Sequence, residues 1–452
     1  MIHVTLQDLK RLLKVRCFAI LFLFFVQLAL SQQSTTSIVL NRDTLDLGQK
    51  PILLNEVVVS TSDLSAYQLV MESKKTMQPL VETNRQEFTY FLRHSELNDV
   101  HLDFQLKKSS LEQIDDRMIE QITQSIPTHS SIHVEALLKL TQNDSLGESA
   151  RLLRGFELEE ESSKIDAENV AEFFLEKIEE SLSKGNYFKV KSGIFGGKIE
   201  ENDIDLNELR SQKDDIVQDS IDVQKIHRIQ STVGYQKLME INKYQPHYSD
   251  PQVAVYSKPK RFDFQIVDYT LFKDHWVHVV AFKEKSKAQF YGELWISEED
   301  KALLQFKFIN NKPIKSLKLL GIEYLEPRVQ GQFLYKKFDD GSYRNYFGRL
   351  EQDTKVSIDR PLSFIEKKKS FIGGRKVNRV DLDMFFSLNQ IEEYTYILSE
   401  KEVQITDNEN YFILEKLDSY PPHYWKDEAF SIAPSEAMKN FKKLTKKLGK
   451  TQ

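Results

Sequence analysis

The carboxy-terminal half of the chain alternates apolar and polar residues with a period of two. Phe262, Phe264 and Ile266 begin this pattern, and it returns at 276–282, 290–296, 304–308, 333–335, 343–347, 377–385 and 411–414. Because successive side chains of a strand point to opposite faces, each segment predicts a strand with one buried face. Short strands separated by turn residues favour an antiparallel meander, so we expect a large curved sheet or an open half-barrel here.

Upstream of this half the pattern is mixed. Apolar residues recur at helical spacing in 64–71, 110–125 and 167–183, and Asp63 is placed to cap the first of these helices. Segments 88–94 and 100–106 alternate instead, and the polar residues between them predict the turn of a β-hairpin. The expected fold class is α+β, with an amino-terminal helical and mixed region followed by the large curved antiparallel sheet.

Composition changes divide the chain into six segments. They are a signal peptide at 1–31, an extended segment at 32–62, a mixed α/β region at 63–199, a charged helical connector at 200–250, an antiparallel β-sheet domain at 251–420 and a basic carboxy-terminal tail at 421–452. We place the main boundary in or just after the connector, because residues 200–222 are highly charged and poor in aromatic side chains.

The amino terminus has the pattern of a secretory signal peptide. An apolar run at 17–30 follows four basic residues, Lys10, Arg11, Lys14 and Arg16. The run is short for a spanning helix, which needs roughly 20 apolar residues. Small residues at Ala29 and Ser31 predict cleavage near 31–32. We therefore expect an exported protein of the periplasm or the outer membrane surface; the alternative is an uncleaved anchor helix.

The composition excludes several kinds of chemical site and binding partner. The only cysteine, Cys17, lies in the predicted signal peptide, so the mature chain would have no disulfide, thiol nucleophile or thiolate ligand. A net charge of −6 gives no field that attracts nucleic acid. A hydrophobic content of 40% is enough to build a core without disulfides, and no later segment is long and apolar enough to span a membrane.

Sequence motifs of catalysis are absent. The chain has no GxxxxGK[ST] loop, GxSxG elbow or HExxH helix. His129 and His133 are spaced for one face of a helix, but Pro127 favours a turn that enters a strand. His275 and His278 would point to opposite faces of a strand. We therefore expect no catalytic residue, no metal site and no cofactor.

Two groups of side chains remain as weaker candidates. Asp381 and Asp383 share a face of a predicted strand, as paired carboxylates do in acid–base catalysis, although the solvated side of a sheet explains them more simply. The second group is a possible wall for an apolar ligand on the curved sheet, for which core packing is the alternative. Its members are Phe290, Leu294, Trp295 and Phe306.

Several segments resemble one family of exported proteins. LLNEVVVS at 53–60 is similar to the exit strand of the carboxypeptidase-like regulatory domain found in exported proteins of Bacteroidota. Other segments resemble later elements of that family in the expected order: AYQLVMESKKTM at 66–77, FTYFLRH at 88–94, YFKVKSGIFGGK at 187–198, KAQFYGELWIS at 287–297, DRPLSFIE at 359–366 and WKDEAFSIAPSEAMKNF at 425–441. The regulatory β-sandwich itself is largely missing, because 32–51 is too short for several strands. The resemblance implies export and this architecture, but no peptidase activity.

Three functions are open at this point. The first is a non-enzymatic cell-envelope protein that binds an envelope partner or serves as a scaffold. The second is a periplasmic carrier or sensor of a lipid-like ligand held in a half-barrel, which rests on analogy of fold. The third is a hydrolase without a recognisable motif. A filled core with an exposed apolar patch would favour the first, and a continuous apolar cavity the second.

Overall fold

The fold is seen in a computed structural model of the whole chain. The structure describes residues 64–77, 86–112, 114–125, 128–143, 147–159, 186–193, 195–200, 223–285, 290–368, 375–399, 411–426 and 433–441. The predicted signal peptide, the extended segment at 32–62 and the predicted helix at 167–183 lie outside these residues.

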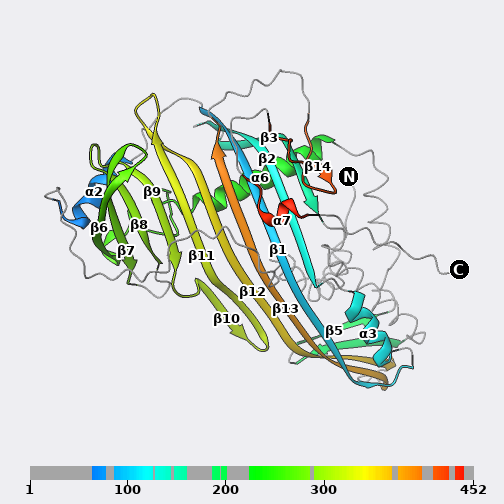
Figure 1. The fold of residues 1–452 in the computed structure, drawn as a ribbon. Helices are drawn as coiled ribbons and strands as arrows, with labels where there is room; N and C mark the ends of the chain where they lie inside the picture. The colour runs from blue at the N-terminus through cyan, green and yellow to red at the C-terminus, as the bar shows by residue number, and fades with distance from the viewer. Residues whose placement is uncertain are drawn as a thin grey trace, which may run out of the picture.

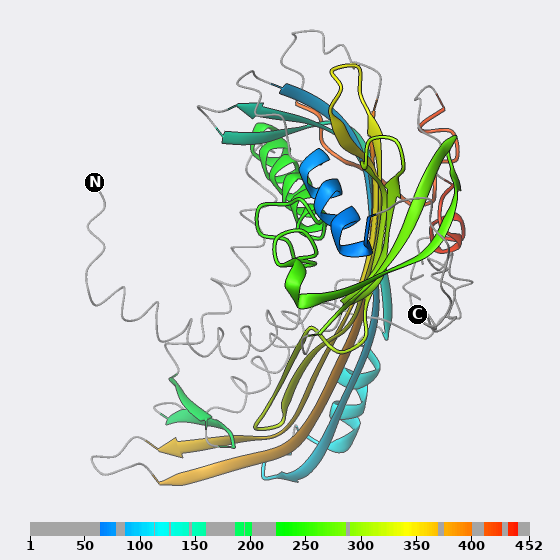
Figure 2. The same ribbon diagram turned by 90° about the vertical axis from the view of Figure 1, so that its left-hand side faces the viewer.

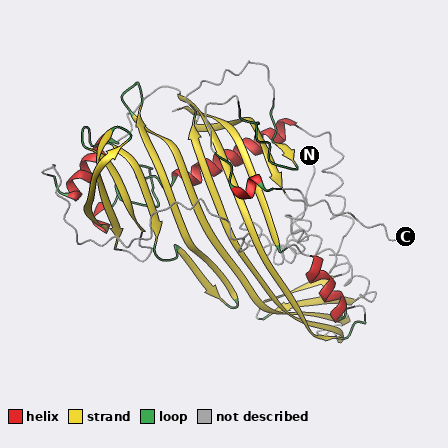
Figure 3. Cartoon of the chain, viewed as in Figure 1, coloured by secondary structure: helices red, strands yellow, loops and turns green. Residues whose placement is uncertain are grey.

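One large sheet of 14 strands dominates the described residues (Figures 1 and 3). The strands are β1 (Gln86–Ser109), β2 (His129–Asn143), β3 (Gly147–Glu159), β4 (Asn186–Ser192), β5 (Phe195–Glu200), β6 (Phe262–Phe272), β7 (His275–Glu284), β8 (Phe290–Ser297), β9 (Leu303–Asn310), β10 (Lys315–Leu319), β11 (Ile322–Lys337), β12 (Tyr343–Lys368), β13 (Lys376–Leu398) and β14 (Glu415–Leu417). Their order is β14-β3-β2-β1-β13-β12-β11-β9-β8-β7-β6, with β10 added to β11 and the β4–β5 hairpin added to β12. The β14–β3 pair is parallel, and the other pairs are antiparallel.

Three long strands give the sheet its curvature. β1, β12 and β13 have 24, 26 and 23 residues, which corresponds to roughly 80 Å each at about 3.3 Å per residue. Figure 2 shows these strands bending along their length, so that the sheet has a concave and a convex face. Helices α2 (Ala66–Thr76) and α6 (Val223–Asn242) lie on the concave side, and the short helix α7 (Glu436–Lys439) lies on the convex side.

The expectation of a large curved antiparallel sheet is confirmed. The sheet extends further along the sequence than predicted, because β1, β2 and β3 join the same sheet as the strands after residue 262. β1 lies next to β13 near the middle of the strand order. The described strands of the amino-terminal region therefore supply part of the same sheet.

Segments 88–94 and 100–106 do not form the predicted hairpin. They belong to the single strand β1, and the polar residues between them pair with 389–392 of β13 in unbroken antiparallel register. A polar stretch remains in a strand here because its neighbour is equally long and satisfies its backbone groups. Glu96 and Asn98 consequently project from one face of the sheet, together with His94.

Two smaller expectations are also corrected. The first helix is capped by Ser65 and not by Asp63: the Ser65 hydroxyl accepts from the Gln68 amide, and the Gln68 side chain accepts from the Ser65 amide, which is a capping box. Residues 411–414 were expected to form a strand, but the strand is β14, immediately after them. The Leu414 amide donates to the side chain of Gln230 on α6, and so does not enter a sheet ladder.

The largest core cluster lies between the concave face and helices α2 and α6. Leu69 and Val70 of α2 and Leu238 and Ile241 of α6 are fully buried in it. Aromatic side chains from neighbouring strands form its centre, with ring centroids 5.5–6.3 Å apart among Phe282, Phe306, Phe308 and Phe333. The helix α3 (Asp116–Ser125) belongs to a separate cluster with the ends of β1, β12 and β13. No helix in the described part of the chain is both long and apolar enough to cross a bilayer.

Candidate functional site

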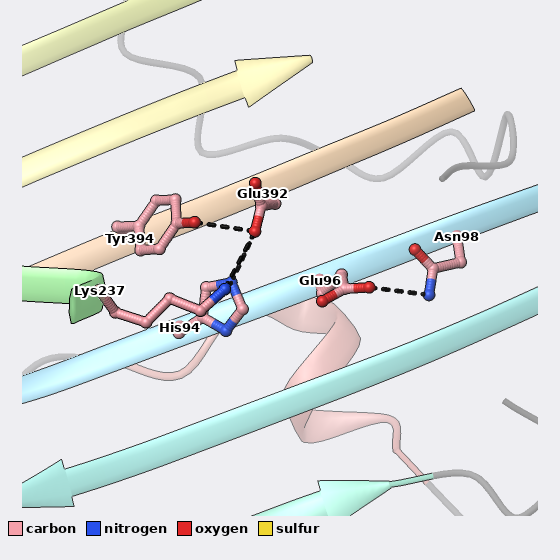
Figure 4. Close-up of polar contacts among 6 residues, drawn as sticks. All are labelled: His94, Glu96, Asn98, Lys237, Glu392 and Tyr394. Atoms are coloured by element: carbon pink, nitrogen blue, oxygen red, sulfur yellow. Dashed lines mark hydrogen bonds and ion pairs between the residues drawn. The ribbon is translucent and has the colours of Figure 1, made fainter. Parts of the chain in front are cut away.

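A cluster of polar side chains lies on the concave face where β1 and β13 pair beneath α6 (Figure 4). The strand register places His94 opposite Tyr394 and Glu96 opposite Glu392. Because residues two apart share a face, these four side chains project together toward α6. Lys237 of α6 extends into the cluster from the helix side. We call these residues, with Asn98, the concave cluster.

Lys237 and Glu392 are at the centre of the concave cluster. The Lys237 ammonium lies 3.2 Å from Glu392 Oε1 and 3.3 Å from His94 Nε2. Glu392 Oε1 also accepts a hydrogen bond of 2.8 Å from the Tyr394 hydroxyl and lies 3.3 Å from His94 Nε2. Asn98 Nδ2 donates to Glu96 Oε1 at 3.4 Å. His94, Lys237, Glu392 and Tyr394 are thus joined by contacts with one another, and Glu96 and Asn98 form a separate pair beside them.

Burial and the neighbouring charges set the protonation of this cluster. Burial lowers the pKa of His94, so the ring is neutral at pH 7. Burial acts to raise the pKa of Glu392, but the His94 hydrogen bond and the Lys237 charge outweigh it and bring that pKa to about 2. Burial, followed by repulsion from Glu392, raises the pKa of Glu96. The two facing glutamates therefore differ in acidity, and Glu392 is the ionised partner of Lys237.

The arrangement is suited to holding a cation. The Lys237 ammonium donates to the Glu392 carboxylate and also contacts His94 Nε2. His94 Nε2 and one oxygen each of Glu96 and Glu392 lie within 4.8 Å of one another. Imidazole nitrogen and carboxylate oxygen are also ligands of divalent metal ions. In the structure the positive charge at this point is the ammonium group of Lys237.

Residues on the opposite face of the same strands form a second polar contact. Arg93 Nε and Nη2 lie 2.7 and 2.6 Å from Glu135 Oε1, and Arg93 Nη1 donates to the Ala433 carbonyl at 2.8 Å. The indole N–H of Trp425 donates to Glu135 Oε2 at 2.5 Å. These bonds attach the carboxy-terminal segment to the convex face, where Figure 1 shows α7 in front of β1. We call this group the convex contact.

The concave cluster was not predicted from the sequence, for a physical reason. His94 and Glu392 are 298 residues apart, and Lys237 comes from a third element between them. These residues do not belong to one local sequence motif, because only the pairing of β1 with β13 and the packing of α6 bring them together. The alternation of His94, Glu96 and Asn98 was the available signal, but it was interpreted as the end of a strand and a turn.

The predicted ligand-wall residues lie in or against the main core. Phe290, Leu294 and Phe306 are buried in that cluster, and Leu294 and Phe306 are cross-strand partners. Trp295 is partly buried, and its indole N–H donates to Glu293 Oε2 at 2.8 Å. Their proposed contact with a ligand stays a prediction, while their contacts with neighbouring side chains are direct: Phe290 and Phe306 each pack against Phe308.

The histidine and aspartate pairs singled out in the sequence do not form shared sites among the described residues. His129 is exposed and pairs with Asp99 at 3.2 Å, whereas His133 is buried and bonds to Ser95 Oγ at 2.9 Å. His275 is exposed and His278 is buried against Glu298.

The two aspartates have separate partners as well. Asp381 accepts from Arg379 Nε and from the Ser363 hydroxyl at 2.6 Å, and Asp383 pairs with Lys107 at 3.1 Å. Each carboxylate is thus neutralised by its own neighbour and does not act with the other.

An exposed apolar hairpin is the second candidate feature. β10 and the start of β11 form it, and we call residues 315–326 the leucine hairpin. All five residues of β10 are exposed, and the side chains of Leu317, Leu319 and Leu320 are 57%, 59% and 50% exposed. Among the described strands, β10 pairs with β11 alone, so its outer edge presents backbone donors and acceptors.

No protein-family model and no curated protein matches the sequence. Among solved structures, the chain is similar to a LolA superfamily protein from Nitrosomonas europaea, with a TM-score of 0.20 and 9% identity over 75% of this chain and 96% of that one. It is also similar to the Pseudomonas aeruginosa MucA/MucB complex, with a TM-score of 0.16 and 6% identity over 74% of this chain and 94% of that one. For MucB in complex with MucA(peri), the TM-score is 0.15 and the identity 7%, over 72% of this chain and 93% of that one.

Proposed function

We propose that this chain is a non-enzymatic, exported cell-envelope protein that binds an extended segment of a partner protein at the outer edge of β10. The observation that carries the proposal is the leucine hairpin, in which three exposed leucines lie on or beside a strand whose outer edge pairs with none of the other described strands. An extended partner segment that adds as a further strand would satisfy the backbone of β10 and cover the leucine side chains. Residence in the periplasm or at the outer membrane, and kinship with the carboxypeptidase-like regulatory family of Bacteroidota, are parts of this proposal and rest on the sequence.

The charges of the hairpin favour pairing. Lysines at a sheet edge usually discourage strand addition because their charge must stay in water. Here Lys315 lies 2.8 Å from Glu326 and Lys318 lies 3.2 Å from Glu323, both on the neighbouring strand β11. The two edge lysines are therefore neutralised within the hairpin, and the edge does not repel a partner strand.

The turn of the leucine hairpin contains a residue, Leu320, that lowers the conformational stability of the turn. Leu320 and Gly321 connect β10 to β11 with φ angles of +51° and +79°. Two-residue turns with a positive φ at both positions favour Asn or Gly there. A left-handed conformation costs other L-amino acids roughly 1–2 kcal/mol. A leucine at such a position is half-exposed and strained, which is typical of a residue retained for contact with a partner.

The contacts of the proposed wall residues favour partner binding over a lipid carrier. Phe290 and Phe306, two of the side chains proposed as a ligand wall, each have a ring contact with Phe308, and Phe306 has another with Phe282. The carboxylates proposed for a hydrolase are separately paired with Arg379 and Lys107. These contacts support the first of the three functions.

Photo-crosslinking in cells that naturally produce the protein tests the proposal. A photoreactive amino acid at Leu319 is expected to yield one discrete protein adduct, whereas the same group at Leu271 is not. Leu271 is the matched control, since it is 55% exposed on β6, a different strand. No adduct from position 319, or the same adduct from both positions, would contradict the proposal.

Substitutions then separate binding from folding. The double variant Leu317→Thr, Leu319→Thr keeps residues that favour strands but removes apolar area. It is expected to weaken the affinity for the identified partner by at least about tenfold, since burial of each leucine contributes roughly 1.5–3 kcal/mol. Leu320→Gly is expected to weaken binding while raising the thermal stability of the protein, because it relieves the positive φ. Leu271→Thr is expected to leave the affinity unchanged.

A further inference from the structure

The concave cluster brings together donor atoms of the kind that hold a metal ion. His94 Nε2, one oxygen of Glu96 and one oxygen of Glu392 lie within 4.8 Å of one another. The separation of His94 Nε2 from Glu392 Oε1 is 3.3 Å. Two ligands of a tetrahedral zinc ion lie roughly 3.4 Å apart, given bond lengths of about 2.0–2.2 Å. Two of the three donors are thus already at the spacing that such an ion requires.

We propose that the concave cluster is a binding site for a divalent transition-metal ion of the zinc type, in which the ion takes the place of the Lys237 ammonium. His94, Glu96 and Glu392 are its protein ligands. A fourth position stays open for water or an exogenous ligand, as it does in sites with three protein ligands.

The scaffold around these ligands is suited to a metal site. The three side chains rise from two strands paired in unbroken register over this region, so their relative positions are set by backbone hydrogen bonds. Hydrogen bonds orient both carboxylates: Tyr394 donates to Glu392, and Asn98 donates to Glu96. Partners of this kind fix ligand direction in metal sites and raise affinity.

Lys237 is the group with which the ion would compete. Its ammonium already contacts two of the three ligands, which shows that the position favours a positive charge. The Lys237 side chain is 29% exposed and reaches the cluster through a flexible stem, so it can turn toward solvent. Displacing it does not release α6, because Leu238 and Ile241 remain buried and the Ser231 hydroxyl still accepts from the Leu152 amide.

Isothermal titration with zinc chloride tests this site in the full chain. We expect wild type to bind one zinc ion and Lys237→Met to bind it at least tenfold more tightly, because methionine keeps the aliphatic length and removes the competing charge. Lys243→Met is the matched control; this lysine follows the same helix and pairs with Glu240 outside the cluster. Its affinity for zinc should equal that of wild type.

Removal of ligands completes the test. Adding Glu392→Gln to Lys237→Met should reduce zinc affinity at least a hundredfold, and adding His94→Gln provides a second variant if the first does not fold. Circular dichroism of each variant before titration establishes that the fold is intact. If Lys237→Met binds zinc no more tightly than wild type, or if tight binding survives both ligand substitutions, the site is elsewhere and the assignment is wrong.

Discussion

Neighbouring residues of β1 attach different segments of the chain to opposite faces of one sheet. Arg93 points to the convex face and joins the carboxy-terminal segment through Glu135 and Ala433. His94 points to the concave face, where it meets Lys237 of α6 and Glu392 of β13. Both contacts combine a cation with a carboxylate, and both join residues distant in sequence. They differ in how completely the charges are enclosed.

The convex contact is closed and the concave cluster is partly open. The side chains of Arg93 and Glu135 are 9% and 0% exposed, and each has partners beyond the ion pair, in Ala433 and Trp425. The side chains of Lys237 and Glu392 are 29% and 17% exposed. A rigid guanidinium with several fixed bonds is difficult to replace, whereas a flexible ammonium is exchangeable. Similar charge pairs therefore form a fully enclosed attachment on one face and a partly exposed one on the other.

The largest effect is expected where the charge is fully enclosed. Glu135→Gln keeps the shape of the side chain but leaves Arg93 buried without its counterion, which is expected to cost about 3–5 kcal/mol in the free energy of unfolding. Urea unfolding gives this value, and limited proteolysis of residues 411–441 should become faster. If Glu135→Gln costs no more than Lys237→Met, the distinction between a closed and an open contact fails.

Acid is expected to weaken the convex face through His133. Burial, then the charges of His94 and Arg93, lowers the pKa of His133 to about 3, and its ring packs edge-on against Phe441. A histidine with a depressed folded pKa stabilises the fold above its unfolded pKa, about 6.5, and this stability is lost as pH falls from there toward 3. The loss is roughly 1.4 kcal/mol for each pH unit in that window.

Urea unfolding of wild type and His133→Gln between pH 7 and pH 4 isolates this effect. Glutamine can still bond to Ser95 but does not titrate in this range. Other acidic groups titrate equally in both proteins, so the stability difference between them should shift with pH in favour of the variant. A difference that is constant across this pH range would show that protonation of His133 does not oppose folding.

The strands of the sheet were predictable because their signal is local. Alternation from residue 262 onward predicted β6, β7, β8 and β9, and helical spacing predicted α2 and α3. Alternation cannot show how far a strand continues through polar residues, and this is why β1 was divided at Glu96–Asp99. Its continuity depends on β13, nearly 300 residues later in the sequence.

The two candidate sites could not be predicted for different reasons. The concave cluster needs the β1–β13 register and the position of α6, neither of which local patterns contain. The leucine hairpin is local, but the alternation in SLKLLG does not distinguish an exposed strand from a covered one. Its exposure arises because β10 pairs with the outermost part of β11, beyond the reach of β9. Sequence alone therefore located apolar strands but not which of them remain uncovered.

The smallest effect is expected at the exchangeable contact. Lys237→Met removes a partly exposed ion pair, and such pairs contribute about 1 kcal/mol or less to the free energy of unfolding. Glu392 keeps its bond from Tyr394 and its contact with His94, so its charge is not left without partners. Urea unfolding in metal-free buffer measures the change, with Lys243→Met as the reference for loss of a surface lysine. A cost near that of Glu135→Gln would mean that Lys237 is a fixed structural group, and the exchange of its charge for a metal ion would then be disfavoured. A cost near that of the reference variant would mean that the apolar side chains of α6 hold the helix in place. The charge at position 237 could then be exchanged for a metal ion.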